Sequence, residues 1–174
     1  MCKKSISNRI SGFLHEHIKA IEKEKDSLFK EHYTENVKES MDAQEFFREY
    51  INFIYNYLDN LKAETDNSDS CPFVIINSIV EVQDMEDMET YQYRIVLPYS
   101  EEKDISIDCA SCLSPLGKAL LLKSIGQQVN VQIPTGTLSY VIKKITVTEQ
   151  AIPECNKTYN HKGNTWQPNI SLTM

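Results

Sequence analysis

The sequence predicts an α+β protein in which an antiparallel α-helical hairpin, a coiled coil, precedes a small β-sheet domain with one short helix. Residues 5–64 contain no proline and one glycine, whereas the residues after Pro72 alternate between apolar and polar types. The polar residues 65–72 separate the two parts and read as a linker. We therefore expect a hairpin at 1–69, a globular domain at 70–148 and a loosely ordered tail at 149–174.

Apolar residues recur at helical spacing in two stretches of the first part. They are Ile6, Ile10, Phe13, Leu14, Ile18, Ile21 and Leu28, and then Phe47, Ile51, Ile54, Leu58 and Leu61. The second set follows an unbroken heptad rhythm, which buries one helix stripe against another. The rhythm lapses at 32–40, so we expect helices at 5–32 and 40–64, each about 40 Å long. Because no third helix would cover this seam, we expect the hairpin to protrude.

The second part shows strand patterns interrupted by one helical segment. Strands are expected at 73–82 (a strand pair or one bent strand), 91–97, 104–108, 128–133 and 138–147. Ser114 and Pro115 precede an apolar segment at 116–122 that reads as a short helix, because proline is tolerated in a first helical turn. This order of elements predicts a small twisted sheet with one helix.

Composition and charge restrict the partners and the location. The net charge is −7 and the isoelectric point about 5.1, so autonomous binding to DNA or RNA is not expected. A protein partner fits better, and we expect a monomer. No apolar stretch reaches the roughly 18 residues of a membrane span, and the five cysteines show no secreted disulfide pattern. We therefore expect a cytoplasmic protein.

Cysteine and histidine residues offer few candidates for chemistry. Cys109 and Cys112 could be ordinary cysteines, a metal site or a redox pair, although the spacing to possible further ligands (Cys71, Cys155 and His161) matches no zinc motif. The four histidines, His15, His17, His32 and His161, form no catalytic pair and are expected on the surface.

One stretch of the second part has a more specific pattern. Between Ser111 and Gly136 the chain carries a Ser-Pro pair, a short Ala-Leu helix, a glycine before an alternating strand, and a Pro-Thr-Gly turn. In this order and spacing the segment resembles the C-terminal domain of the GreA/GreB transcription elongation factors, over about residues 73–147. The resemblance implies an FKBP-like sheet domain. Two alignments of the strand before Ser114 remain open: either residues 109–113 are an insertion, or the strand is longer and the motif starts at Ser111.

The resemblance also implies a function through RNA polymerase and not as a free-standing enzyme. In that family the hairpin enters the secondary channel of the polymerase, and carboxylates at its tip help to hold Mg²⁺ for cleavage of backtracked RNA. The matching carboxylates here are Glu35, Glu39 and Asp42, with Asn36 where the first acid is expected. Glu39 and Asp42 would share the polymerase's Mg²⁺; the chain would need no cofactor of its own and would meet nascent RNA only indirectly.

Polymerase contacts are expected from Asn36 at the tip and from Ser114 and Pro115 at the channel rim. Because Asn36 brings no charge, the tip could stimulate cleavage or only occlude and modulate the channel. A binding module of the type called regulator of nucleoside diphosphate kinase shares the second domain but has a shorter helical part. A prolyl isomerase would need an aromatic-lined pocket. The candidates for lining it are Phe73, Tyr91, Tyr93 and Tyr140.

Overall fold

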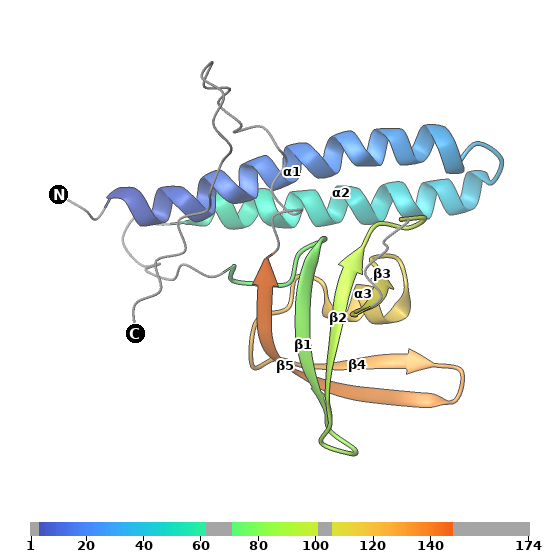
Figure 1. The fold of residues 1–174 in the computed structure, drawn as a ribbon. Helices are drawn as coiled ribbons and strands as arrows, with labels where there is room; N and C mark the ends of the chain where they lie inside the picture. Colours follow the sequence, from blue (N-terminus) through green and yellow to red (C-terminus); the bar gives the residue numbers. More distant parts are fainter. Residues whose placement is uncertain (1–3, 62–70, 101–105, 148–174) are drawn as a thin grey trace, which may run out of the picture.

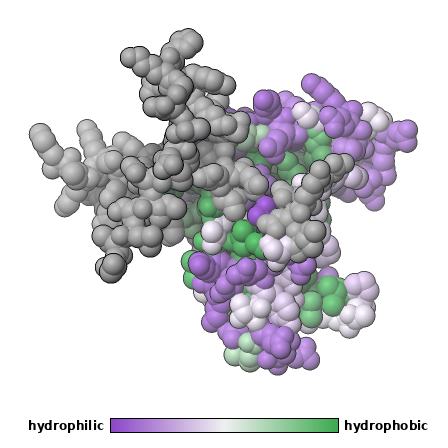
Figure 2. All heavy atoms as spheres, in the orientation of Figure 1, coloured by the Kyte–Doolittle hydropathy of each residue, from purple (hydrophilic) through white to green (hydrophobic). Residues whose placement is uncertain are grey.

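The computed structural model describes residues 4–61, 71–100 and 106–147, and of residues 4–9 only the backbone. It consists of a helical hairpin that lies lengthwise across one end of a curled five-stranded sheet (Figure 1). The predicted α+β class is confirmed. The predicted tail and most of the predicted linker fall outside the described residues, so the predicted domain boundaries there remain predictions. Figure 2 shows hydrophilic side chains over the hairpin near its turn and hydrophobic ones where the hairpin meets the sheet.

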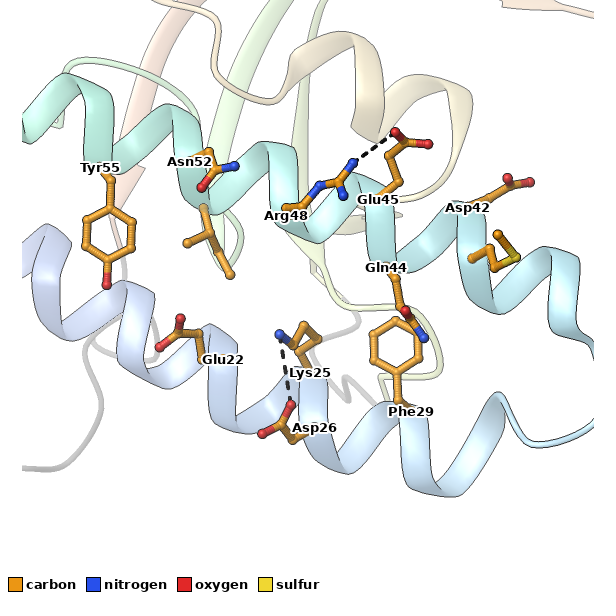
Figure 3. A pocket seen from close by; sticks show the side chains of 12 residues that line it. Glu22, Lys25, Asp26, Phe29, Asp42, Gln44, Glu45, Arg48, Asn52 and Tyr55 are labelled. Carbon is orange, nitrogen blue, oxygen red and sulfur yellow. Dashed lines mark hydrogen bonds and ion pairs between the residues drawn. The ribbon is translucent and has the colours of Figure 1, made fainter.

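The hairpin consists of α1 (Lys4–His32) and α2 (Val37–Asn60). The predicted seam is buried: Leu14, Ile18 and Ile21 on α1 face Phe47, Ile51 and Ile54 on α2 within one hydrophobic core. On the outer side of this seam a groove runs between the two helices, with the ion pairs Arg48–Glu45 (3.1 Å) and Lys25–Asp26 (3.9 Å) along it (Figure 3).

The second helix begins three residues earlier than predicted. Asn36 is its N-cap, with its side-chain oxygen accepting a hydrogen bond from the Glu39 backbone N–H at 3.3 Å. An asparagine followed three residues later by a glutamate is a recognisable helix start. The sequence prediction instead placed the start at Ser40, because the apolar rhythm resumes only after it.

The sheet has the strand order β3-β2-β1-β5-β4. Its strands are β1 (Ser78–Asp84), β2 (Thr90–Val96), β3 (Asp108–Ser111), β4 (Gln128–Ile133) and β5 (Gly136–Val147). All neighbours pair antiparallel except β2 and β3, which are parallel. A register shift between Glu81 and Val82 lets the long β5 pair with β1 and also with β4. The short helix α3 (Pro115–Leu120) connects β3 to β4.

Two strand predictions need correction. The strand expected at 73–82 begins only at Ser78, because Asn77 has a positive φ of 68° and turns the chain. Of the strand expected at 104–108, residues 104–105 lie outside the described residues; the described strand is Asp108–Ser111, and a two-residue turn leads from it to Ser114. Residues 109–111 are therefore strand and not an inserted loop, which agrees with the alignment that starts the Ser-Pro motif at Ser111.

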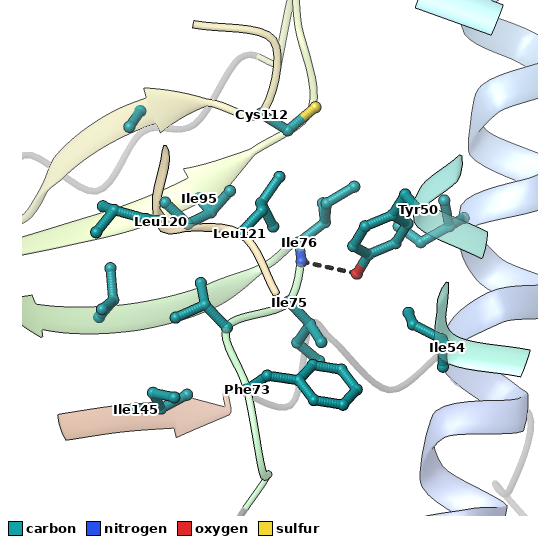
Figure 4. Close-up of a cluster of buried hydrophobic side chains, with 14 of the residues drawn as sticks. Tyr50, Ile54, Phe73, Ile75, Ile76, Ile95, Cys112, Leu120, Leu121 and Ile145 are labelled. Atoms are coloured by element: carbon teal, nitrogen blue, oxygen red, sulfur yellow. Dashed lines mark hydrogen bonds between the residues drawn. The ribbon is translucent and has the colours of Figure 1, made fainter. Parts of the chain in front are cut away.

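The expectation of a protruding hairpin is wrong, because the sheet domain packs along α2. The phenolic oxygen of Tyr50 accepts a hydrogen bond from the Ile76 backbone N–H at 3.0 Å (Figure 4). The same oxygen lies 2.7 Å from Nε2 of His17 on α1. Phe73 contacts the rings of Phe53 and Tyr57 edge-on. The buried segment 73–76 thus covers the seam that a third helix would otherwise have to cover.

His17 is fully buried at this junction, so the prediction that it lies on the surface is also wrong. The Tyr50 hydroxyl oxygen accepts a hydrogen bond from the Ile76 N–H, and its O–H can donate one to Nε2 of His17. The pattern of apolar residues did not indicate that His17 is buried. A buried histidine can be told from a surface histidine only when its hydrogen-bond partner is known.

Candidate functional site

The turn of the hairpin carries the predicted carboxylates and packs against the sheet domain. Tyr33 is buried in this turn and packs on Phe29 (ring centroids 5.0 Å apart) and on Tyr99 in the β2–β3 connection (6.1 Å). The ring of His32 stacks on Tyr99 at 4.4 Å. These aromatic contacts fix where the tip lies relative to the sheet.

Glu35, Glu39 and Asp42 are all exposed near this turn, as expected for residues that meet a partner. Glu39 stands in the first turn of α2, where the helix dipole favours a negative charge, and its carboxylate accepts a hydrogen bond from the Asn36 amide at 3.2 Å. Asp42 follows one turn later and lines the outer groove (Figure 3). The three residues therefore share one end of the hairpin, while Asn36 has a structural role as the cap.

The carboxylates of the tip do not make a complete cation site by themselves. Within the described parts of the chain, no group of three or more His, Cys, Asp or Glu side chains is arranged to hold a metal ion. Glu39 and Asp42 offer hard oxygen ligands of the kind that Mg²⁺ prefers, but Mg²⁺ usually requires six. The remaining ligands would have to come from water or from another molecule.

The second predicted surface surrounds the start of α3. The Ser114 hydroxyl donates a hydrogen bond to the Ser111 carbonyl (2.7 Å) and accepts one from the Gly117 N–H (3.0 Å), so it caps α3 and ties it to the end of β3. Pro115 follows at the first helical turn and is exposed. Of the two predicted rim residues, Pro115 is free to contact a partner, whereas Ser114 is half-buried and already engaged in two hydrogen bonds.

Gly117 has a structural role beside Ser114 and Pro115 that the sequence interpretation did not explain. A Cβ atom added there would lie 2.0 Å from the Ser111 carbonyl oxygen, so only glycine allows α3 to approach β3 this closely. The position of this glycine two residues after Pro115 was the sequence feature that could have indicated the close approach. On the same helix, Lys118 places its ammonium group 5.9 Å from the centre of the Phe46 ring on α2.

The cysteines of the described residues do not favour thiolate chemistry. Cys109 is exposed on the edge strand β3, whereas Cys112 and Cys71 are buried, and none of the three forms a disulfide. Burial raises the pKa of the Cys112 thiol to about 12 and that of Cys71 to about 11. A reactive pair needs a lowered pKa, so the structure does not support the redox interpretation of Cys109 and Cys112. Cys155 and His161 lie outside the described residues.

Thiol alkylation should separate these cysteines. At pH 8 we expect iodoacetamide to modify Cys109 rapidly and Cys71 and Cys112 only slowly, because the last two are buried and protonated. Peptide mass spectrometry after a short pulse measures each site, and a sample in urea, in which all three should react alike, is the control. Protection of Cys109 that ends when a chelator is added would instead support a metal site.

Comparisons with known proteins show which proteins the second part of the chain is similar to. Residues 69–147 match the family model described as "Transcription elongation factor, GreA/GreB, C-term". The GreA of Syntrophobacter fumaroxidans is 41% identical over 71 residues, which cover 41% of this chain and 44% of that protein. The GreA of Alkaliphilus oremlandii is 47% identical over 73 residues, covering 42% of this chain and 45% of that protein.

A solved GreA/GreB structure from Nitrosomonas europaea aligns with 74% of this chain and 93% of its own, at 21% identity and a TM-score of 0.44. No helix in the described ranges combines the length and apolarity needed to cross a membrane. The chain spans less than half the length of the two GreA relatives above, and both helices of the hairpin lie outside the family match. Residues 69–147 are therefore similar to the C-terminal domain of the GreA/GreB transcription elongation factors.

Proposed function

We propose that this protein binds RNA polymerase as a Gre-type elongation factor and acts on backtracked complexes through the tip of its hairpin. The observation that carries the proposal is the family match at residues 69–147, in a chain whose preceding hairpin exposes carboxylates at its turn. In this proposal the exposed Pro115 contacts the polymerase, and the hairpin reaches the secondary channel. The chain has no reaction of its own to catalyse.

At the polymerase active site, Glu39 and Asp42 would supply carboxylate oxygens next to the catalytic magnesium. A bound Mg²⁺ there stabilises charge on the attacking and leaving oxygens of phosphodiester hydrolysis. Glu39 and Asp42 are one turn apart on α2, so one helix end can present both to the same ion. Glu35 lies in the turn and adds a third charge close by.

A second candidate, a channel-binding regulator without cleavage activity, is favoured by the residue at position 36. Asn36 stands where the family pattern has an acid, and it caps α2 while its amide donates a hydrogen bond to the Glu39 carboxylate. For either candidate, the turn packs against Tyr99, so entry of the hairpin into a channel requires those ring contacts to open. A non-cleaving regulator would compete with cleaving factors for the same surface.

A nucleoside diphosphate kinase regulator and a prolyl isomerase both fit the structure less well. The helices of 29 and 24 residues are long for a regulator of nucleoside diphosphate kinase, which has a shorter helical part. A prolyl isomerase needs free aromatic side chains around a pocket, but Phe73 is buried against Phe53 and Tyr57.

A cleavage assay on backtracked complexes tests the proposal. We expect the wild-type protein to compete with a GreA factor for purified polymerase. If it stimulates cleavage, Glu39→Ala with Asp42→Ala should reduce the cleavage rate about 10- to 100-fold without reducing competition, by loss of metal-orienting oxygens. The control is the Glu86→Ala change in the exposed β1–β2 connection, which should leave both readouts unchanged.

Pro115→Ala tests the rim contact, because this exposed side chain can be removed without removing the Ser114 cap. We expect weaker competition for polymerase with unaltered thermal unfolding. Competition without cleavage in the wild type would identify the non-cleaving regulator, and absence of any competition would exclude both candidates.

A further inference from the structure

The outer groove between α1 and α2 has a partly apolar lining and is open to a ligand. It has a volume of about 860 Å³, and those of its lining residues that the structure describes all belong to the two helices. Phe29 and Ile51 contribute apolar surface from the core, while Met41 (64% exposed) and Tyr55 (40% exposed) present apolar surface at its margins. Exposed apolar side chains gathered along one helix pair indicate a docking surface.

The charges around this groove select for a cationic occupant. Four carboxylates line it, and they belong to Glu22, Asp26, Asp42 and Glu45. Only Lys25 and Arg48 oppose them, which leaves a net charge of −2. A second copy of the hairpin would bring the same excess of negative charge to the interface. Two such grooves would therefore repel each other, and a second copy is a poor occupant.

A segment with the complementary character lies in the same chain. Residues 155–174 contain Lys157 and Lys162 and no aspartate or glutamate, although the whole chain has a net charge of −7. The same segment includes Tyr159, Trp166 and Leu172. Its composition therefore combines positive charge with large apolar side chains, which matches the acidic rim and the apolar lining of the groove.

The segment starts close enough to reach the groove. β5 ends at Val147, which pairs with Ser78, two residues after the Ile76 amide that is bonded to Tyr50 of α2. The chain thus leaves the sheet beside the hairpin, as Figure 1 also shows for the end of β5. The seven residues 148–154 can span about 23 Å when extended, and a helix with its side chains is about 10 Å across. The connection is long enough to pass around α2.

We propose that residues 155–174 dock in the outer groove of the hairpin, with their lysines against its acidic rim and their aromatic side chains on its apolar lining. The docked segment would cover Tyr55 and Met41, and it would lie against Asp42 at the tip end of the groove. The proposal concerns this chain alone and does not depend on the polymerase-binding function.

The chain contains one tryptophan, Trp166, so its fluorescence reports on this segment without any label. In the protein of residues 1–174 we expect Trp166 emission at shorter wavelength, and acrylamide quenching severalfold weaker, than in a free peptide of residues 148–174. Met41→Ser with Tyr55→Ser should restore quenching to the peptide value. The control pair Met85→Ser and Ile125→Ser changes side chains of similar exposure (43% and 53%) outside the groove, and it should leave quenching unchanged.

A charge pair tests the acidic rim. Glu22→Lys in the groove should increase quenching and shift the emission to longer wavelength, whereas Glu86→Lys on the β1–β2 connection should not. Added salt should weaken protection in the wild type. Circular dichroism checks that each variant keeps its helix content.

Three results would overturn the proposal. Quenching in the wild type equal to that of the peptide would mean that the segment is not docked. Protection that the groove variants leave intact would place it elsewhere on the molecule. Protection that disappears on dilution would mean that the segment binds a second copy.

Discussion

Replacing Gly117 by alanine is expected to destabilise the protein by about 3 kcal/mol or more. The added Cβ would lie 2.0 Å from the Ser111 carbonyl oxygen and 2.8 Å from its carbonyl carbon. Both atoms are backbone at the end of β3, so no side-chain rotation relieves the overlap. Either α3 or the end of the parallel strand pair must move.

Chemical denaturation followed by circular dichroism measures this loss, and Gly12→Ala is the matched control. Gly12 is exposed within α1, and a Cβ built there meets nothing within 4 Å. Alanine is the better helix former, so the control should gain about 0.5–1 kcal/mol. Equal stability of the Gly117→Ala variant and the wild type would show that α3 packs less closely on β3 than described.

Removing the hydroxyl group of Tyr50 should have the second largest effect. Tyr50→Phe preserves the ring but leaves the Ile76 N–H and Nε2 of His17 without this partner at a buried junction. Each unsatisfied buried group costs about 1–3 kcal/mol, so we expect a loss of about 2–4 kcal/mol. Tyr55→Phe on the exposed face of the same helix is the control and should change stability by less than about 0.5 kcal/mol.

The same variant should alter the response to alkaline pH. Burial raises the pKa of Tyr50 well above the ordinary tyrosine value of about 10. The unfolded chain therefore releases this proton at lower pH than the folded chain, and folding loses stability as the pH rises above about 10. Tyr50→Phe lacks this group, so its urea-unfolding free energy should fall less steeply with pH than that of the wild type. Parallel profiles would argue against a buried hydroxyl.

The elements of the fold were largely predictable from local patterns. Helix and strand periodicities located α1, α2, β2, β4 and β5, because each buries one stripe or one face against a single core. The buried segment 73–76 was mistaken for strand because apolar runs do not reveal whether their backbone pairs in a ladder or turns. The positive φ of Asn77 decides this, and it is a property of the folded chain.

The arrangement of the hairpin on the sheet was not predictable in the same way. The junction depends on the side chains of Tyr50 and His17 and on the backbone N–H of Ile76, which are far apart in the sequence, and Tyr and His are types found both in cores and on surfaces. The position of Glu35, Glu39 and Asp42 near one exposed end of the hairpin was predictable, while their role in a site stays a prediction. The ring contacts of Tyr99 with His32 and Tyr33 were not predicted, because a tyrosine in the connection between two strands does not reveal which distant residues it contacts.

The burial of residues 73–76 against α2 determines how the molecule can be divided. Phe73, Ile75 and Ile76 belong to the same buried cluster as Ile18, Phe47 and Ile54. Expressing the family domain alone would place the first three in water, where they would favour self-association. The helices alone would likewise lose the cover of their seam. The two parts should therefore melt in a single transition, and a fragment that begins near residue 69 is a poor substitute for the whole chain in any solution experiment.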